Sequence, residues 1–76
     1  MEFQLQSREG AYPCEVTIDD DNGRYMIRKA DTSGEVFNSP LELYQWIQDH
    51  WKANDFKDGE HYNEVMGELE DYLANA

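Results

Sequence analysis

The segment Tyr12–Arg28, with the sequence YPCEVTIDDDNGRYMIR, decides the fold that we predict for this chain. Over residues 12–19 apolar and polar side chains alternate, which is the period of a strand with one buried face. The dipeptide Asn22-Gly23 follows, and it is typical of a two-residue hairpin turn, because a type I′ turn needs positive φ at both positions. We therefore expect a hairpin in which Ile18 faces Ile27.

The charges of this segment fit the same pairing. The polar face of the predicted hairpin carries two arginines and three carboxylates: Arg24, Arg28, Glu15, Asp19 and Asp21. Cross-strand ion pairs account for both arginines without a nucleic-acid ligand. Lys29 is expected opposite Val16 on the apolar face, where its ammonium group can extend past the margin of the sheet.

Further strands are predicted on both sides of the hairpin. Before it, Phe3, Leu5 and Ser7 alternate with polar residues. After it, residues 31–34 form a turn signal and residues 35–37 a short fourth strand. The sequence does not decide which side chain of this fourth strand, Val36 or Phe37, points inward.

Two helices are predicted after the strands. The first begins at Ser39, the N-cap, with Pro40 at the first helical position and Glu42 completing a capping box. Its apolar side covers an arc of about 160°, wider than the ~100° that one supporting surface requires. The arc carries Leu43, Tyr44, Trp46, Ile47, His50 and Trp51.

The second helix is predicted from about Gly59 or Glu60 to the last residues, with Asp58 as its cap. One narrow stripe is apolar: Tyr62, Val65, Met66, Leu69, Tyr72 and Leu73. The opposite stripe is acidic: Glu60, Glu64, Glu68 and Asp71. The predicted fold is therefore α+β, an antiparallel meander of three to four strands followed by two helices on one sheet face, in a single small domain over residues 1–76.

The charge of the chain restricts its partners. It has 17 acidic and 6 basic residues, for a formal net charge of −11. Such a surface repels phosphate backbones and anionic lipid, so we expect no direct binding of nucleic acid or membranes. With one cysteine, no signal-peptide pattern and no long apolar run, we expect a cytoplasmic protein.

We predict no catalytic, cofactor or metal site from the sequence. The run Asp19–Gly23 does not match a calcium loop, because Ile18 and Lys29 fall where ligands are needed. The two histidines and the cysteine lack zinc-site spacing. We expect His50 in or at the edge of the core, His61 exposed, and Cys14 as a small buried apolar residue.

Two features indicate a binding role. The acidic stripe is either a solvated face or a docking face for a basic protein, and the aromatic arc either is covered within the fold or leaves an anchor exposed. The candidate partner-binding residues are Tyr44, Trp46, Glu60, Glu64, Glu68 and Asp71. We expect a non-catalytic protein-binding or regulatory module whose partner is a basic protein or a second copy. The alternatives are a nucleic-acid-mimicking inhibitor of a basic protein, and a small enzyme or accessory subunit using His50 or Cys14.

Overall fold

The structure is a computed structural model and describes residues 1–10 and 12–75. Its four strands are β1 (Glu2–Leu5), β2 (Cys14–Asp19), β3 (Arg24–Arg28) and β4 (Gly34–Phe37). They are followed by α1 (Pro40–His50), the short 3-10 helix η1 (Ala53–Asp55) and α2 (Gly59–Ala74). The strands form one antiparallel sheet in the order β1-β2-β3-β4, which confirms the predicted α+β meander followed by two helices.

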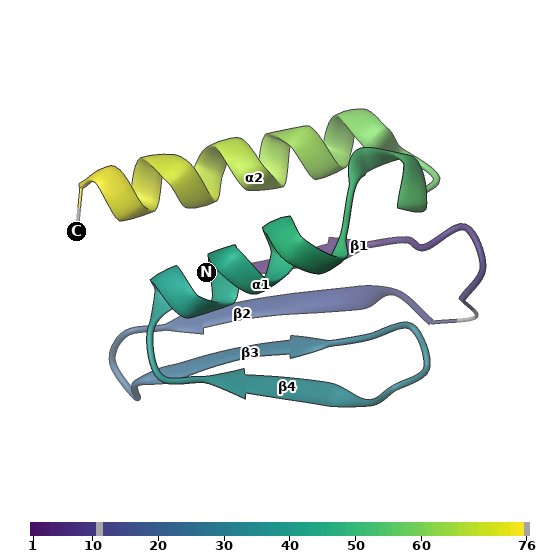
Figure 1. Cartoon of the computed structure of the whole chain (residues 1–76). Coiled ribbons are helices and arrows are strands. Elements are labelled where there is room, and N and C mark those ends of the chain that lie inside the picture. Colours follow the sequence, from purple (N-terminus) through teal and green to yellow (C-terminus); the bar gives the residue numbers. More distant parts are fainter. Residues whose placement is uncertain (11, 76) are drawn as a thin grey trace.

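Both helices lie on the same face of the sheet (Figure 1). α1 packs against β3 and β4, whereas α2 packs against β1, η1 and α1. No element within residues 1–10 and 12–75 covers the opposite sheet face, and Val36 on that face is 78% exposed. The molecule therefore has two layers, with α2 along the outside of the helical layer.

The β2–β3 hairpin corrects the predicted register. Asp19 pairs with Arg24, so the loop has four residues, Asp20 to Gly23, and Ile27 faces Val16 instead of Ile18. Gly23 has positive φ (61°), but Asn22 does not, so the type I′ turn is absent. Instead, the Asn22 side chain donates to the Asp19 carboxylate at 2.8 Å. The shift is two residues, and since strand side chains alternate with period two, each one keeps its predicted face.

At the ends of the strands, the structure corrects the predicted positions of Tyr12 and Lys29 and shows which side chain of β4 points inward. Tyr12 is not on the buried face: β2 begins only at Cys14, after Pro13, and Tyr12 is 59% exposed. In β4, Phe37 points inward and packs against the core, while Val36 points outward. Lys29 lies just after β3 rather than opposite Val16, and its ammonium group pairs with Glu35 at 3.2 Å.

The helix starts follow the sequence closely. The Ser39 hydroxyl accepts from the Glu42 amide at 3.2 Å, as predicted for an N-cap. The Glu42 carboxylate, however, accepts from the amide of Asn38, one residue earlier than a capping box requires. The Asp58 carboxylate accepts from the first-turn amides of α2, which confirms it as the cap.

The core lies between the sheet and the helices. Its buried residues are Leu5, Cys14, Val16, Ile18, Ile27, Leu43, Ile47, Phe56, Tyr62, Val65, Met66 and Leu69. Phe56 comes from the connection between the helices and is 2% exposed. That connection is held to the chain after β1 by backbone hydrogen bonds from Arg8 to Asp55 (3.0 Å) and from Lys57 to Gln6 (2.9 Å).

Candidate functional site

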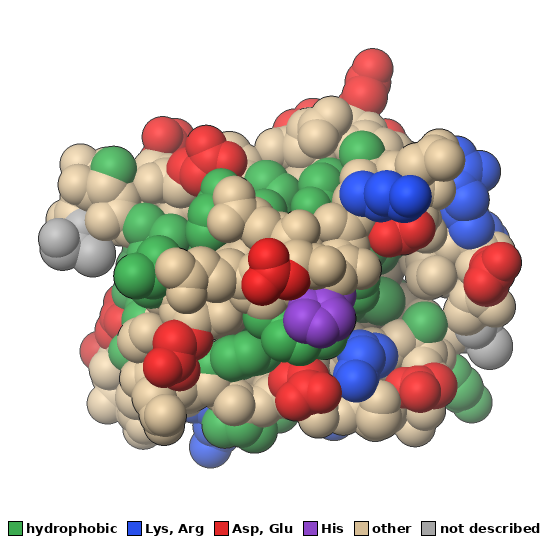
Figure 2. All heavy atoms as spheres, viewed as in Figure 1, with side chains coloured by type: hydrophobic (Ala, Val, Ile, Leu, Met, Phe, Trp, Pro, Cys, Tyr) green, Lys and Arg blue, Asp and Glu red, His purple; other side chains and the backbone are tan. Residues whose placement is uncertain are grey.

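The outer side of α2 carries the predicted acidic stripe, which we call the acidic face and define as Glu60, Glu64, Glu68 and Asp71. All four side chains are exposed, and Figure 2 shows acidic side chains over α2 at the top of the view. Within the described part of the chain, none of the four pairs with a lysine or arginine; Glu64 lies 3.9 Å from His61. The lysines and arginines among the described residues therefore do not neutralise the acidic face.

Gly67 lies among these carboxylates, also exposed. A Cβ atom added there would meet nothing within 4 Å, and its φ is not positive. Neither close packing nor backbone geometry requires glycine at this position, yet glycine in a helix interior costs about 1 kcal/mol relative to alanine. The fold described here does not explain this residue.

Tyr44 is half-buried and joins the two helices. Its hydroxyl donates to the Glu70 carboxylate at 2.7 Å and accepts from Gln48. Burial, followed by the hydrogen bond and charge of Glu70, raises the pKa of Tyr44 to about 12. Its polar tip is thus engaged within the fold.

Trp46 is also half-buried and lies in a row of aromatic rings. Its ring centroid is 6.3 Å from that of Phe37, with the two rings tilted, and 5.3 Å from that of Trp51, with the two rings edge to face. The Lys29 ammonium group lies 5.8 Å from the Trp46 centroid. The sheet and a neighbouring lysine therefore cover much of this ring, and its predicted role as a partner anchor stays a prediction.

His50 is exposed, which corrects its predicted place at the core. It lies at the end of α1, where its ring stacks on Trp46 with centroids 4.3 Å apart and Nδ1 lies 2.8 Å from the Trp46 carbonyl. No carboxylate of the described residues pairs with it. His61 is half-exposed rather than free in solvent, with Nε2 2.8 Å from the Gln4 carbonyl.

Cys14 is 3% exposed, which confirms its predicted burial. Burial raises the pKa of its thiol, so the reactive thiolate is disfavoured. Among residues 1–10 and 12–75 no group of three histidine, cysteine or acidic side chains is placed to hold a metal ion. Arg28 lies 3.9 Å from Glu15 across the strands, which confirms the predicted cross-strand pairing for this arginine. Arg24 is opposite Asp19 in the register but forms no ion pair among the described residues, so the prediction is not confirmed for it.

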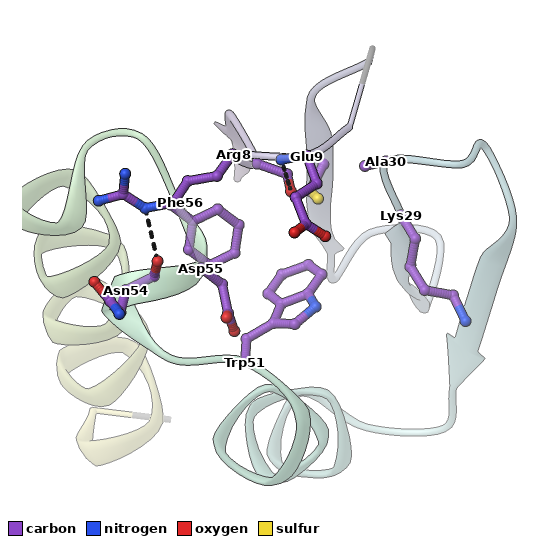
Figure 3. Close-up of a pocket in the computed structure, with 10 residues that line it drawn as sticks. Arg8, Glu9, Lys29, Ala30, Trp51, Asn54, Asp55 and Phe56 are labelled. Atoms are coloured by element: carbon purple, nitrogen blue, oxygen red, sulfur yellow. Dashed lines mark hydrogen bonds between the residues drawn. The ribbon is translucent and has the colours of Figure 1, made fainter.

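The structure also contains a cavity that the sequence did not predict. It has a volume of about 350 Å³ and is lined by residues that follow β1, residues that follow β3, and residues of η1 and its flanks (Figure 3). We call it the end pocket and define it by six of its lining residues: Arg8, Glu9, Lys29, Trp51, Asp55 and Phe56. These residues come from three separate segments, and only the aromatic residues around the interhelical turn gave a signal in the sequence.

Comparison of the sequence with protein-family models and with curated proteins gives no match, and comparison of the fold with solved structures gives none either. Of the helices in the described residues, none has the length and apolar character needed to cross a membrane.

Proposed function

We propose that this protein is a non-catalytic binding or regulatory module that docks on a basic surface of another protein through the acidic face. One observation carries the proposal: the four carboxylates are exposed together on the outermost helix without a lysine or arginine of the described chain to pair with. Carboxylates one helical turn apart repel each other, and a basic partner would replace that repulsion with attraction.

Gly67 supports the same surface. A glycine leaves the helix backbone without a side chain, so a partner can approach α2 closely between the carboxylates. The position has no structural need for glycine, and a face that served only solubility would be more stable with alanine. Close approach of a partner would explain why this position is glycine.

The competing functions have less support. Two copies would each bring a net charge of −11, which opposes a homodimer. Catalysis by Cys14 requires a thiolate that burial disfavours, and no carboxylate among the described residues pairs with His50 to orient it. A nucleic-acid mimic is a narrower form of our proposal, in which the basic partner normally holds nucleic acid. A cytoplasmic location also remains a prediction.

The test is a pull-down from native lysate with two variants that lose equal charge. The first, Glu64→Gln/Glu68→Gln/Asp71→Asn, neutralises three of the four carboxylates of the acidic face. The matched control, Glu2→Gln/Asp21→Asn/Asp49→Asn, removes three exposed carboxylates from β1, the hairpin loop and α1. We expect mass spectrometry to identify a basic protein that wild type and control retain at low salt, and that the first variant and high salt release.

Equal loss from both variants would mean that net charge, not the acidic face, attracts the protein, and unchanged retention by the first variant would also contradict the proposal. Adding double-stranded DNA to the retained complex distinguishes the mimic. Release by DNA indicates that the partner's nucleic-acid groove is occupied, whereas an undisturbed complex indicates another basic surface.

A further inference from the structure

We propose that the end pocket binds an organic cation with an alkylammonium head. Its volume of about 350 Å³ falls within the range of small-ligand pockets, roughly 300–1,000 Å³. The inference rests on the cavity, its aromatic walls and the directions of its charged groups, and it does not depend on the proposed role of the acidic face.

The walls are suited to a cation. Trp51 and Phe56 meet edge to face with centroids 5.3 Å apart, and Trp51 is the more exposed of the two. A cation within about 6 Å of an aromatic centroid is attracted by the negative face of the ring, most strongly for tryptophan. The molecule already shows this contact nearby, since the Lys29 ammonium group lies 5.8 Å from the Trp46 centroid.

The charged side chains of the pocket point in different directions. In Figure 3 the Glu9 carboxylate is turned toward the Trp51 indole, while the ends of Arg8 and Lys29 are turned away. The Lys29 ammonium group is held by Glu35 at 3.2 Å, and the Arg8 Nε donates to the Asn54 carbonyl at 2.8 Å. The cavity thus offers a carboxylate that forms no ion pair within the described residues.

Asp55 adds a second acidic group. One of its carboxylate oxygens accepts from the Lys52 amide at 3.0 Å, so this side chain is fixed and partly used. A metal ion fits less well, because no cluster of three acidic, histidine or cysteine side chains forms a ligand set among the described residues. The Glu9 carboxylate turned toward an indole ring matches an alkylammonium ion, which needs one counter-charge and an apolar surface.

The test is a titration of the full-length protein with n-butylammonium chloride, followed by the indole N–H signals in an NMR spectrum. We expect a saturable shift of the Trp51 signal at millimolar concentration, and a smaller shift for Trp46, which does not line the pocket. Sodium chloride at equal ionic strength and uncharged n-butanol should not reproduce it. Absence of saturation, or equal binding of n-butanol, would overturn the proposal.

Glu9→Gln should weaken n-butylammonium binding roughly tenfold, since it replaces a charged acceptor by a neutral one of the same shape. The matched variant Asp21→Asn removes one negative charge from the hairpin at the other end of the sheet and should leave the affinity nearly unchanged (Figure 1). An unchanged affinity in Glu9→Gln, or an equal loss in both variants, would overturn the proposal.

The alkylammonium head can belong to a free amine or to a lysine side chain of another protein. Lysine with its backbone amine acetylated and its carboxyl group converted to an N-methylamide keeps a free side-chain ammonium group, and this compound distinguishes the two sources. If this blocked lysine binds more tightly than n-butylammonium, the natural ligand is a lysine side chain of another protein. If it binds more weakly, the natural ligand is a free amine.

Discussion

The two helices serve the sheet in the same way but face solvent differently. Both are capped by a side-chain oxygen, and both bury leucines against the same sheet face. The solvent side of α1 carries two acids and two amides: Glu42, Gln45, Gln48 and Asp49. The solvent side of α2 carries the acidic face and Gly67.

This difference shows which features of α2 the fold does not need. Like charges at i and i+4 cost a few tenths of a kcal/mol per pair, and Asp71 lies near the negative end of its helix dipole. α1 remains exposed and polar without a continuous acidic row. The excess of carboxylates on α2 is thus a stability cost that a binding role would explain.

The largest expected effect tests whether both helices are equally anchored. Leu43→Ala in α1 and Leu69→Ala in α2 should each lower the free energy of unfolding by about 2–5 kcal/mol, because both side chains are almost fully buried. Leu41→Ala, at a position 51% exposed, should change it by less than about 0.5 kcal/mol. Urea unfolding followed by circular dichroism measures all three. A Leu69→Ala variant as stable as wild type would show that α2 is not docked.

The next effect concerns Gly67. Gly67→Ala should raise the free energy of unfolding by about 1 kcal/mol, because it reduces the freedom of the unfolded chain and fits the helix without a clash. Gly23→Ala, at φ 61°, should instead lower it by about 1 kcal/mol. Thermal melts compare the two. If Gly67→Ala is destabilising, the glycine has a structural role that would weaken our interpretation of the acidic face.

A smaller effect tests the link between the helices. Tyr44→Phe removes the hydrogen bond to Glu70 and should lower stability at neutral pH by less than about 1 kcal/mol. Tyrosine ordinarily ionises near pH 10, and burial with Glu70 raises the pKa of Tyr44 to about 12 in the folded state. The folded state therefore favours the protonated form: this contribution is full below pH 10 and is lost as pH rises toward 12.

Urea midpoints at neutral and alkaline pH measure this contribution. The decline above pH 10 should be less steep in Tyr44→Phe than in wild type. Tyr12→Phe is the matched control, because its ring is exposed and its hydroxyl forms no hydrogen bond within the described residues. Identical alkaline slopes for wild type and Tyr44→Phe would show that the interhelical bond does not form in solution.

The smallest effect is a reciprocal exchange between the helices. Glu68→Gln relieves repulsion with Glu64 and should stabilise the protein by a few tenths of a kcal/mol, whereas Gln45→Glu adds repulsion with Asp49 and should destabilise it similarly. Added sodium chloride should shrink both changes. A destabilising Glu68→Gln or a stabilising Gln45→Glu, measured by urea unfolding, would contradict the difference that we draw between the two solvent faces.

Local patterns were sufficient to predict the strands and the two α-helices, though not the short helix η1, because alternation, caps and turn residues act over a few positions. The hairpin shows their limit: Asn22-Gly23 predicted a turn correctly, but side-chain hydrogen bonding by Asn22 gave a longer loop. The shift was even, so Val16 and Ile27 stayed on the buried face.

Tertiary contacts explain what the sequence left open. The choice between Val36 and Phe37 depends on pairing of β4 with β3 and on packing against Trp46, and neither is local. His50 lies on the apolar arc by angle, but the helix ends there, so its ring stacks on Trp46 at the surface and remains exposed instead of entering the core. The sequence did not predict the end pocket because its lining residues come from the β1–β2 loop, the β3–β4 loop and the stretch around η1, which are far apart in the chain.

The hydrogen bonds that hold residues 53–57 to the chain after β1 have a consequence for cleavage of the native protein. A link between two helices is commonly a good protease substrate, since it can be drawn out into an enzyme's active site. Here the Phe56 side chain is buried in the core, and the backbone of Asp55 and Lys57 on either side is hydrogen-bonded to the chain after β1. A protease can therefore bind this link only after local unfolding of the core. Brief digestion should therefore spare this link and cut first at the exposed tip at residues 20–23, leaving both helices on one fragment.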